Sequence, residues 1–188
     1  GAYALCDCTG YRLDGTDTEP NMYVGIIINR SLADTTDSVT GLGDVHALVN
    51  AIGEMRRVAR EAGFITIKID DIAKVNARFG FDAGDRVLAE SAACLMDCSR
   101  GKGRLFRSTG PTFVALFDEL GPEAIDEIAS EIERFLGSPV LIGSLEYQPP
   151  IRVATLHLDG VDRQPVSILN ELKALLEEAP QVPGTQLD

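Results

Sequence analysis

Asn76 and Asp85 carry an amide and a carboxylate of the kind that can bind a small polar ligand. They lie in the stretch FITIKIDDIAKVNARFGFDAGDRVL, residues 64–88, where an apolar strand pattern leads to Asn76 and then to Gly80-x-x-x-Gly84-Asp85. Together an Asn amide and an Asp carboxylate can match a ligand edge that carries both acceptors and N–H donors. Both residues also have ordinary structural uses, because an acidic residue suits the first turn of any helix and Asn can cap a turn.

The elements that must position these side chains follow from the periodicity of apolar residues. A strand over 64–69 should place Lys68 on its polar side, because successive side chains of a strand alternate between its faces. The other expected elements alternate along the chain: a helix capped by Asp44 and ended by Gly63, a helix to about Phe79, a loop over 80–85, a helix to about Ser99, strands 104–108 and 113–117 joined by a turn, a helix over 122–137, strands near 139–147 and 151–158, and a helix over 166–178. This order predicts an α/β (α+β) fold in which helices flank a mixed central sheet.

The composition limits the classes of partner. The apolar content of 45% suffices for a core, and the net charge of −12 argues against nucleic-acid binding. No apolar run reaches the roughly 20 residues of a membrane helix. The chain lacks an initiator Met and ends in the Pro/Gly-rich PQVPGTQLD, which suggests a fragment of a longer protein.

The four cysteines form two pairs, Cys6 with Cys8 and Cys94 with Cys98. A zinc site would require the two pairs to meet, and neither pair has C-x-x-C spacing. Buried thiols in a reduced cytoplasm are therefore the preferred interpretation. His46 is expected on the surface of its helix and not as a ligand.

The pattern around Asn76 resembles the nucleotide pocket of GGDEF domains, the diguanylate cyclases of bacterial signalling. The junction D-x-L-T-G-L of that family is matched by Asp37, Thr40, Gly41 and Leu42. The resemblance implies a nucleotidyl-cyclase-like fold over residues 37–178, with a linker over 179–188. It also implies that Asn76 and Asp85 bind the guanine base.

The segment before this domain, residues 1–36, is expected to be a β-hairpin and linker. Two β-rich phrases, ALCDC and MYVGIII, flank a turn-rich stretch within residues 1–31. The phrase YVGIIINRS followed by a polar linker resembles the last strand of a PAS sensor domain, which often precedes a GGDEF domain.

The metal half of the family's site is not matched. In an active member two carboxylates hold Mg²⁺ against the triphosphate of GTP. When the two sequences are aligned from Asn76, the first of these carboxylates corresponds to Lys68 and the second to Pro111. The Glu that follows the second carboxylate corresponds to Thr112. A protonated Lys has no lone pair for a cation and would repel it. Mg²⁺ is therefore not expected to bind well, and no metal ligands are expected.

The phosphate contacts of the family are also altered. The Lys of its last helix falls on Ala179, and the product-inhibition motif R-x-x-D keeps Arg100 but has Gly103 in place of the Asp. Arg100 and Lys68 remain candidates for a phosphate contact, and Lys68 could take the place of the metal by pairing with a phosphate directly. A solvated turn is the alternative interpretation of the basic residues near Arg100.

These residues favour a catalytically inactive GGDEF module of a multidomain, cytoplasmic cyclic di-GMP signalling protein. Such a module would bind GTP as an allosteric ligand or mediate homodimerisation, next to PAS-type sensor and EAL-type output domains. The alternative is an active diguanylate cyclase that uses Asp70 and Asp71 as ligands. A pure dimerisation spacer, with the pocket filled by side chains, is the third hypothesis.

Overall fold

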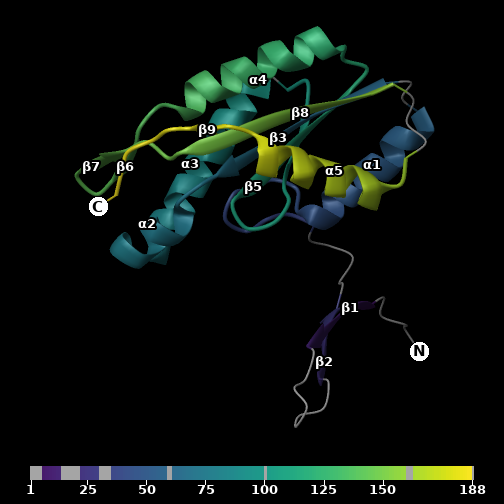
Figure 1. Cartoon of the computed structure of the whole chain (residues 1–188), viewed down its shortest axis with the longest axis horizontal. Coiled ribbons are helices and arrows are strands. Elements are labelled where there is room, and N and C mark those ends of the chain that lie inside the picture. The colour runs from purple at the N-terminus through teal and green to yellow at the C-terminus, as the bar shows by residue number, and fades with distance from the viewer. Residues whose placement is uncertain are drawn as a thin grey trace. The chain divides into compact units, whose positions relative to one another are not determined.

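The computed structural model describes residues 6–13, 22–29, 35–58, 61–99, 101–159 and 163–187. The chain divides into two units, residues 1–35 and 36–188, which are described separately (Figure 1). In the first unit, β1 (Cys6–Leu13) and β2 (Met22–Asn29) pair antiparallel. The predicted pairing of these two segments is confirmed, whereas their relation to a PAS domain stays a prediction.

The second unit is built on a five-stranded sheet with β3 (Glu61–Ile69) at its centre. The order across this sheet is β4 (Arg104–Arg107), β5 (Thr112–Asp118), β3, β8 (Ile151–Asp159) and β9 (Gln181–Val182). Each of these strand pairs is antiparallel. A mixed sheet was predicted, but all of its named strands pair antiparallel. Between the described residues, parallel pairing is limited to an isolated bridge between Gly43 and Phe106.

Helices cover both faces of the sheet, which confirms the predicted α+β class (Figure 1). The helices are α1 (Val45–Val58), α2 (Ile72–Phe79), α3 (Phe81–Ser99), α4 (Pro122–Leu136) and α5 (Pro165–Glu178). On one face Ile65 and Ile67 of β3 share a core with Leu95 of α3 and Ile125 of α4. On the other face the core joins β3 to α1 and α5: Phe64, Leu48, Ile52, Ile168 and Leu172. Burial on both faces makes β3 a rigid base for the residues at its end.

Gly63 and Gly84 were assigned wrong roles by the sequence pattern. The first helix does not extend to Gly63, because α1 ends at Val58 and Gly63 lies inside β3. A β-carbon there would lie 2.3 Å from Cδ1 of Ile125, so Gly63 provides room for α4. The expected loop over 80–85 reduces to Gly80, with φ +89°, and helix α3 begins at Phe81.

Two further expectations differ from the structure. The strand expected near 139–147 is a hairpin of β6 (Val140–Ile142) and β7 (Leu145–Tyr147), in which Gly143 has φ +63°. Residues 181–182, expected in a linker, pair with β8 as β9. Within the described residues no helix is long and apolar enough to cross a membrane.

Candidate functional site

Lys68 lies at the end of β3 in a row of three residues from adjacent strands. Its register partners are Thr112 of β5 and Arg152 of β8. Two cations therefore sit opposite each other on neighbouring strands, an arrangement that is unfavourable unless an anion lies nearby. Because β3 is the central strand and pairs with both β5 and β8, it sets the positions of Thr112 and Arg152 relative to Lys68.

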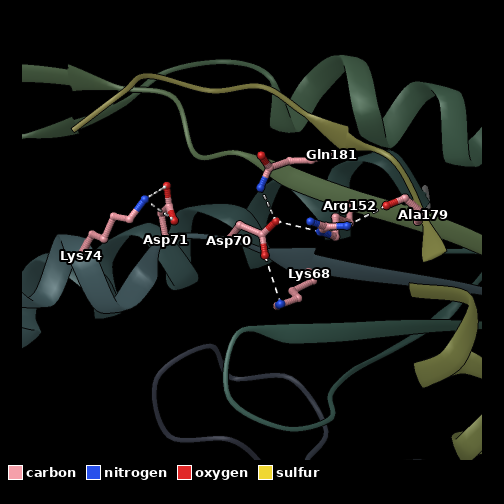
Figure 2. A network of polar contacts seen from close by, with 7 residues as sticks. All are labelled: Lys68, Asp70, Asp71, Lys74, Arg152, Ala179 and Gln181. Atoms are coloured by element: carbon pink, nitrogen blue, oxygen red, sulfur yellow. Dashed lines mark hydrogen bonds and ion pairs between the residues drawn. The ribbon is translucent and has the colours of Figure 1, made fainter. Parts of the chain in front are cut away.

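Asp70 provides that anion. Figure 2 shows its carboxylate between three donors from three segments of the chain. Lys68 Nζ lies 3.2 Å from its Oδ1, while Arg152 Nε and Gln181 Nε2 donate to its Oδ2 at 3.0 and 2.6 Å. Burial acts to raise the pKa of Asp70, but the hydrogen bonds from Gln181, Lys68 and Arg152 outweigh it and lower the pKa below its usual value. Asp70 is therefore a charged, fully engaged structural carboxylate.

The same network reaches the segment that follows α5. Arg152 Nη1 donates to the carbonyl of Ala179 at 2.8 Å, and Gln181 belongs to β9 (Figure 2). Ala179, the position aligned with the family's Lys, is buried and offers its backbone oxygen to a cation. The sequence pattern missed Arg152 and Gln181 because both reach Asp70 only through tertiary pairing.

The residues present here do not fit a magnesium ion. Lys68 and Pro111, which stand where the resemblance places the two metal carboxylates, supply no carboxylate; the carbonyl of Pro111 accepts the Ile69 N–H at 3.0 Å. Asp71 does not replace them: it has φ 62°, and its carboxylate pairs with Lys74 at 3.0 Å, away from Asp70 (Figure 2). Among the described residues, no three His, Cys, Asp or Glu side chains converge at Lys68.

A cavity of about 510 Å³ opens beside Lys68. Small-ligand sites typically have volumes of roughly 300–1,000 Å³. Its charged lining residues are Lys68, Arg152, Lys173 and Glu177. Hydroxyl and amide groups complete its polar wall: Thr66, Ser108, Thr109, Thr112 and Asn170. Lys173 pairs with Glu177 at 3.9 Å, and both are mostly exposed. The cavity thus carries more positive than negative side chains in an acidic chain, which suits an anionic ligand.

Asn76 and Asp85 lie on α2 and α3. The Asn76 side chain packs on Gly84, because a β-carbon at Gly84 would lie 1.9 Å from Asn76 Oδ1. That oxygen is buried and has no hydrogen-bond partner among the described residues, while Asp85 is exposed. The contact of Asn76 with Gly84 therefore brings Asn76 close to Asp85, the residue that follows Gly84 in α3. Neither of these two predicted base contacts lines the cavity beside Lys68.

The junction that precedes α1 is tied to the β4–β5 hairpin by Arg107. Its Nη1 lies 3.0 Å from Oδ1 of Asp37, and its Nε donates to the carbonyl of Gly110 at 2.8 Å. Asp37 also accepts hydrogen bonds from the backbone and hydroxyl of Thr40. Burial acts to raise the pKa of Asp37, but the hydrogen bonds from Thr40 and Arg107 lower it overall. The matched junction residues thus have a structural role in placing the hairpin turn.

The second predicted phosphate contact, Arg100, lies outside the described residues. Gly103, where the resemblance leads one to expect an Asp, is packed against a core aromatic ring. A β-carbon at Gly103 would lie 2.5 Å from Cε1 of Phe117. A larger side chain at this position would therefore require Phe117 to move.

Comparison with known proteins agrees with this architecture. The family model described as "Diguanylate cyclase, GGDEF domain" matches residues 34–179. The chain is 30% identical over 113 residues to the cyclic di-GMP phosphodiesterase PdeR of Escherichia coli (strain K12), covering 59% of this chain and 17% of that protein. It is 30% identical over 84 residues to the diguanylate cyclase DgcS of Shewanella oneidensis, covering 43% of this chain and 28% of that protein.

A solved structure shows the same fold. The FimX GGDEF domain from Pseudomonas aeruginosa superposes with a TM-score of 0.73 at 16% identity, covering 78% of this chain and 94% of that one. The chain spans less than a third of the length of the two curated relatives. Since the family model covers well over half of the sequence and the fold agrees, the chain belongs to the GGDEF domain family.

Proposed function

We propose that residues 37–178 form a non-catalytic GGDEF module that regulates a larger cyclic di-GMP signalling protein. The observation that carries this proposal is the ion pair of Lys68 with Asp70, 3.2 Å apart, at the position where the family has a metal-binding carboxylate. An ammonium 4 Å from a cation, at an effective dielectric near 20, repels it by about 4 kcal/mol per unit charge. Pro111 and Thr112 supply no carboxylate to offset this repulsion.

The relatives support a regulatory setting. By name, one is a cyclic di-GMP phosphodiesterase and the other a diguanylate cyclase, and this chain matches a minor part of each. A domain of this size within such a protein has neighbours to regulate. On the resemblance drawn from the sequence, we propose sensor and output domains of the PAS and EAL types as its partners, in the cytoplasm, with homodimerisation as a further mode of action.

The ligand proposed for the module is GTP, bound without a metal ion. Lys68 and Arg152 share one carboxylate, Asp70, so this group of three carries a net positive charge. A phosphate oxygen entering the adjacent cavity would neutralise that charge, and the Lys68 side chain, 44% exposed, can turn its ammonium group toward it. Asn76 and Asp85 are the proposed base contacts.

The contacts of Asp70 also suggest how binding is transmitted. A phosphate that draws Lys68 or Arg152 away weakens their hold on Asp70, which in turn contacts Gln181 in β9. Arg152 holds Ala179 at the end of α5 as well. Ligand binding and the anchoring of the C-terminal segment therefore compete for the same two cations.

The test is calorimetric titration of GTP in Mg²⁺ and, separately, in EDTA. We expect equal affinity in both buffers, and a loss of at least tenfold in Lys68→Met, which corresponds to about 1.4 kcal/mol. Lys74→Met is the matched control, because Lys74 is an exposed lysine on α2 that pairs with Asp71. Its affinity for GTP should equal that of the wild type.

Three results would count against this account. Binding that EDTA abolishes would show that a metal ion is still required. Equal effects of Lys68→Met and Lys74→Met would remove Lys68 from the site. No binding in either buffer would refute the nucleotide role and leave dimerisation, which sedimentation velocity measures.

A further inference from the structure

A second polar cluster lies at the opposite end of β3 from Lys68. Glu61, the first residue of β3, is the register partner of Asp159, the last residue of β8, and His157 is the partner of Gly63. These three side chains share one face of the sheet, because residues two apart on a strand point the same way. Lys68 is seven positions along β3, roughly 23 Å away at about 3.3 Å per residue.

The side chains converge closely. Nε2 of His157 lies 3.7 Å from Oε2 of Glu61, and Nδ1 lies 3.9 Å from Oδ1 of Asp159. One ligand atom from each residue can be chosen so that all three lie within 4.8 Å of one another. A tetrahedral zinc ion with bonds of about 2.0–2.1 Å places neighbouring ligand atoms roughly 3.4 Å apart. The Glu61–His157 pair is within a few tenths of an ångström of that spacing.

Two features of this cluster, among the residues that the structure describes, are typical of a cation site. Glu61 and Asp159 are carboxylates directly opposite each other on adjacent strands, and like charges so placed destabilise a sheet. Nε2 of His157 is buried and makes no hydrogen bond with the described residues, a costly state for a polar atom. A metal ion bound at Nε2 of His157 and at Glu61 would use the imidazole lone pair. The exposed Asp159 side chain, which lies nearest Nδ1, would have to turn to reach that ion, which would then separate the two negative charges.

We propose that Glu61, His157 and Asp159 bind a divalent transition-metal ion of the zinc class. One imidazole and two carboxylates favour zinc and its neighbours over Mg²⁺, which prefers oxygen ligands alone. Water would complete the coordination, since Asp159 is 94% exposed and the site faces solvent on that side. The ion would join the ends of β3 and β8, so the predicted effect of binding is stabilisation of the sheet. This proposal is independent of the GTP proposal.

The test is titration of the full chain with Zn²⁺, followed by calorimetry and by thermal unfolding. We expect one site whose affinity falls at least tenfold in His157→Gln and in Glu61→Gln. The chain has two histidines, so His46→Gln is the matched control and should bind as the wild type does. Zn²⁺ should raise the unfolding temperature of the wild type and of His46→Gln but not of His157→Gln.

The cysteines are the competing ligands, and Co²⁺ distinguishes them. Burial, followed by the charge of neighbouring Cys98, raises the pKa of Cys94 to about 12, which disfavours its thiolate. Bound Co²⁺ should show d–d absorption without an intense sulfur charge-transfer band. A strong thiolate band, unchanged affinity in His157→Gln, or no binding by folded wild type would each overturn the proposal. Glu61→Gln, a conservative change at a half-exposed residue, serves as the second variant if His157→Gln unfolds.

Discussion

Replacing Asp70 by Asn removes the charge that holds Lys68, Arg152 and Gln181 together. The Asp70 side chain is 10% exposed, and its donors lie 2.6 to 3.2 Å away. The contact with Lys68, 44% exposed, contributes under about 1 kcal/mol because water screens it. The bonds from Arg152 and Gln181 contribute about 1 kcal/mol each. Since Asn keeps one acceptor, we expect a net loss of about 2 kcal/mol, or roughly 30-fold in the folding equilibrium.

The neighbouring Asp71 provides the matched control. Its pair with Lys74 is exposed and i,i+3, so Asp71→Asn should change stability by less than about 0.5 kcal/mol. Asn also tolerates the φ of 62° at this position. Urea unfolding measures both variants, with an unchanged slope indicating that only stability differs. Equal midpoints for the two variants would refute the structural role assigned to Asp70.

Three further predictions follow from burial and charge. Gly63→Ala should lower the free energy of unfolding by about 1–3 kcal/mol, because the added β-carbon overpacks against Ile125. Gly53→Ala in α1 has open space around it and should raise the free energy of unfolding by up to about 1 kcal/mol. Equal urea midpoints for the two variants would contradict this prediction. Tyr147→Phe should leave stability equal or higher, because its buried hydroxyl has no partner among the described residues; a loss above about 1 kcal/mol would show otherwise. Because the pKa of Asp37 is lowered in the folded state, the unfolded chain binds more protons in acid than the folded chain does. Stability should therefore fall as the pH drops below about 4, and it should fall less steeply in Asp37→Asn. Parallel acid-unfolding curves for the wild type and the variant would contradict this prediction.

Strong apolar periodicity explains which elements were predicted well from sequence. Helices α4 and α5, expected over 122–137 and 166–178, form over Pro122–Leu136 and Pro165–Glu178. The wrong element boundaries came from glycines, because a glycine can lie either in a loop or where another side chain packs closely against the backbone. Gly63 and Gly84 lie within a strand and a helix, where Ile125 and Asn76 occupy the space of a β-carbon.

The candidate site could be predicted only in part, for a physical reason. Lys68, Asn76 and Asp85 lie in one short stretch, so a local pattern identifies them. Arg152 and Gln181, the other partners of Asp70, belong to β8 and β9, more than 80 positions later, and only strand register brings them to Asp70. The same holds for Glu61 and His157, which no local spacing connects.

The most direct test of the central claim is a cyclase assay. The chain is incubated with GTP and either Mg²⁺ or Mn²⁺, at protein concentrations high enough for two domains to meet, and cyclic di-GMP is measured by mass spectrometry. An active diguanylate cyclase domain assayed in parallel shows that the conditions support the reaction. With Lys68 and Pro111 at the metal positions, the account predicts no product with either ion. Formation of cyclic di-GMP in amounts that grow with time and protein concentration would contradict it.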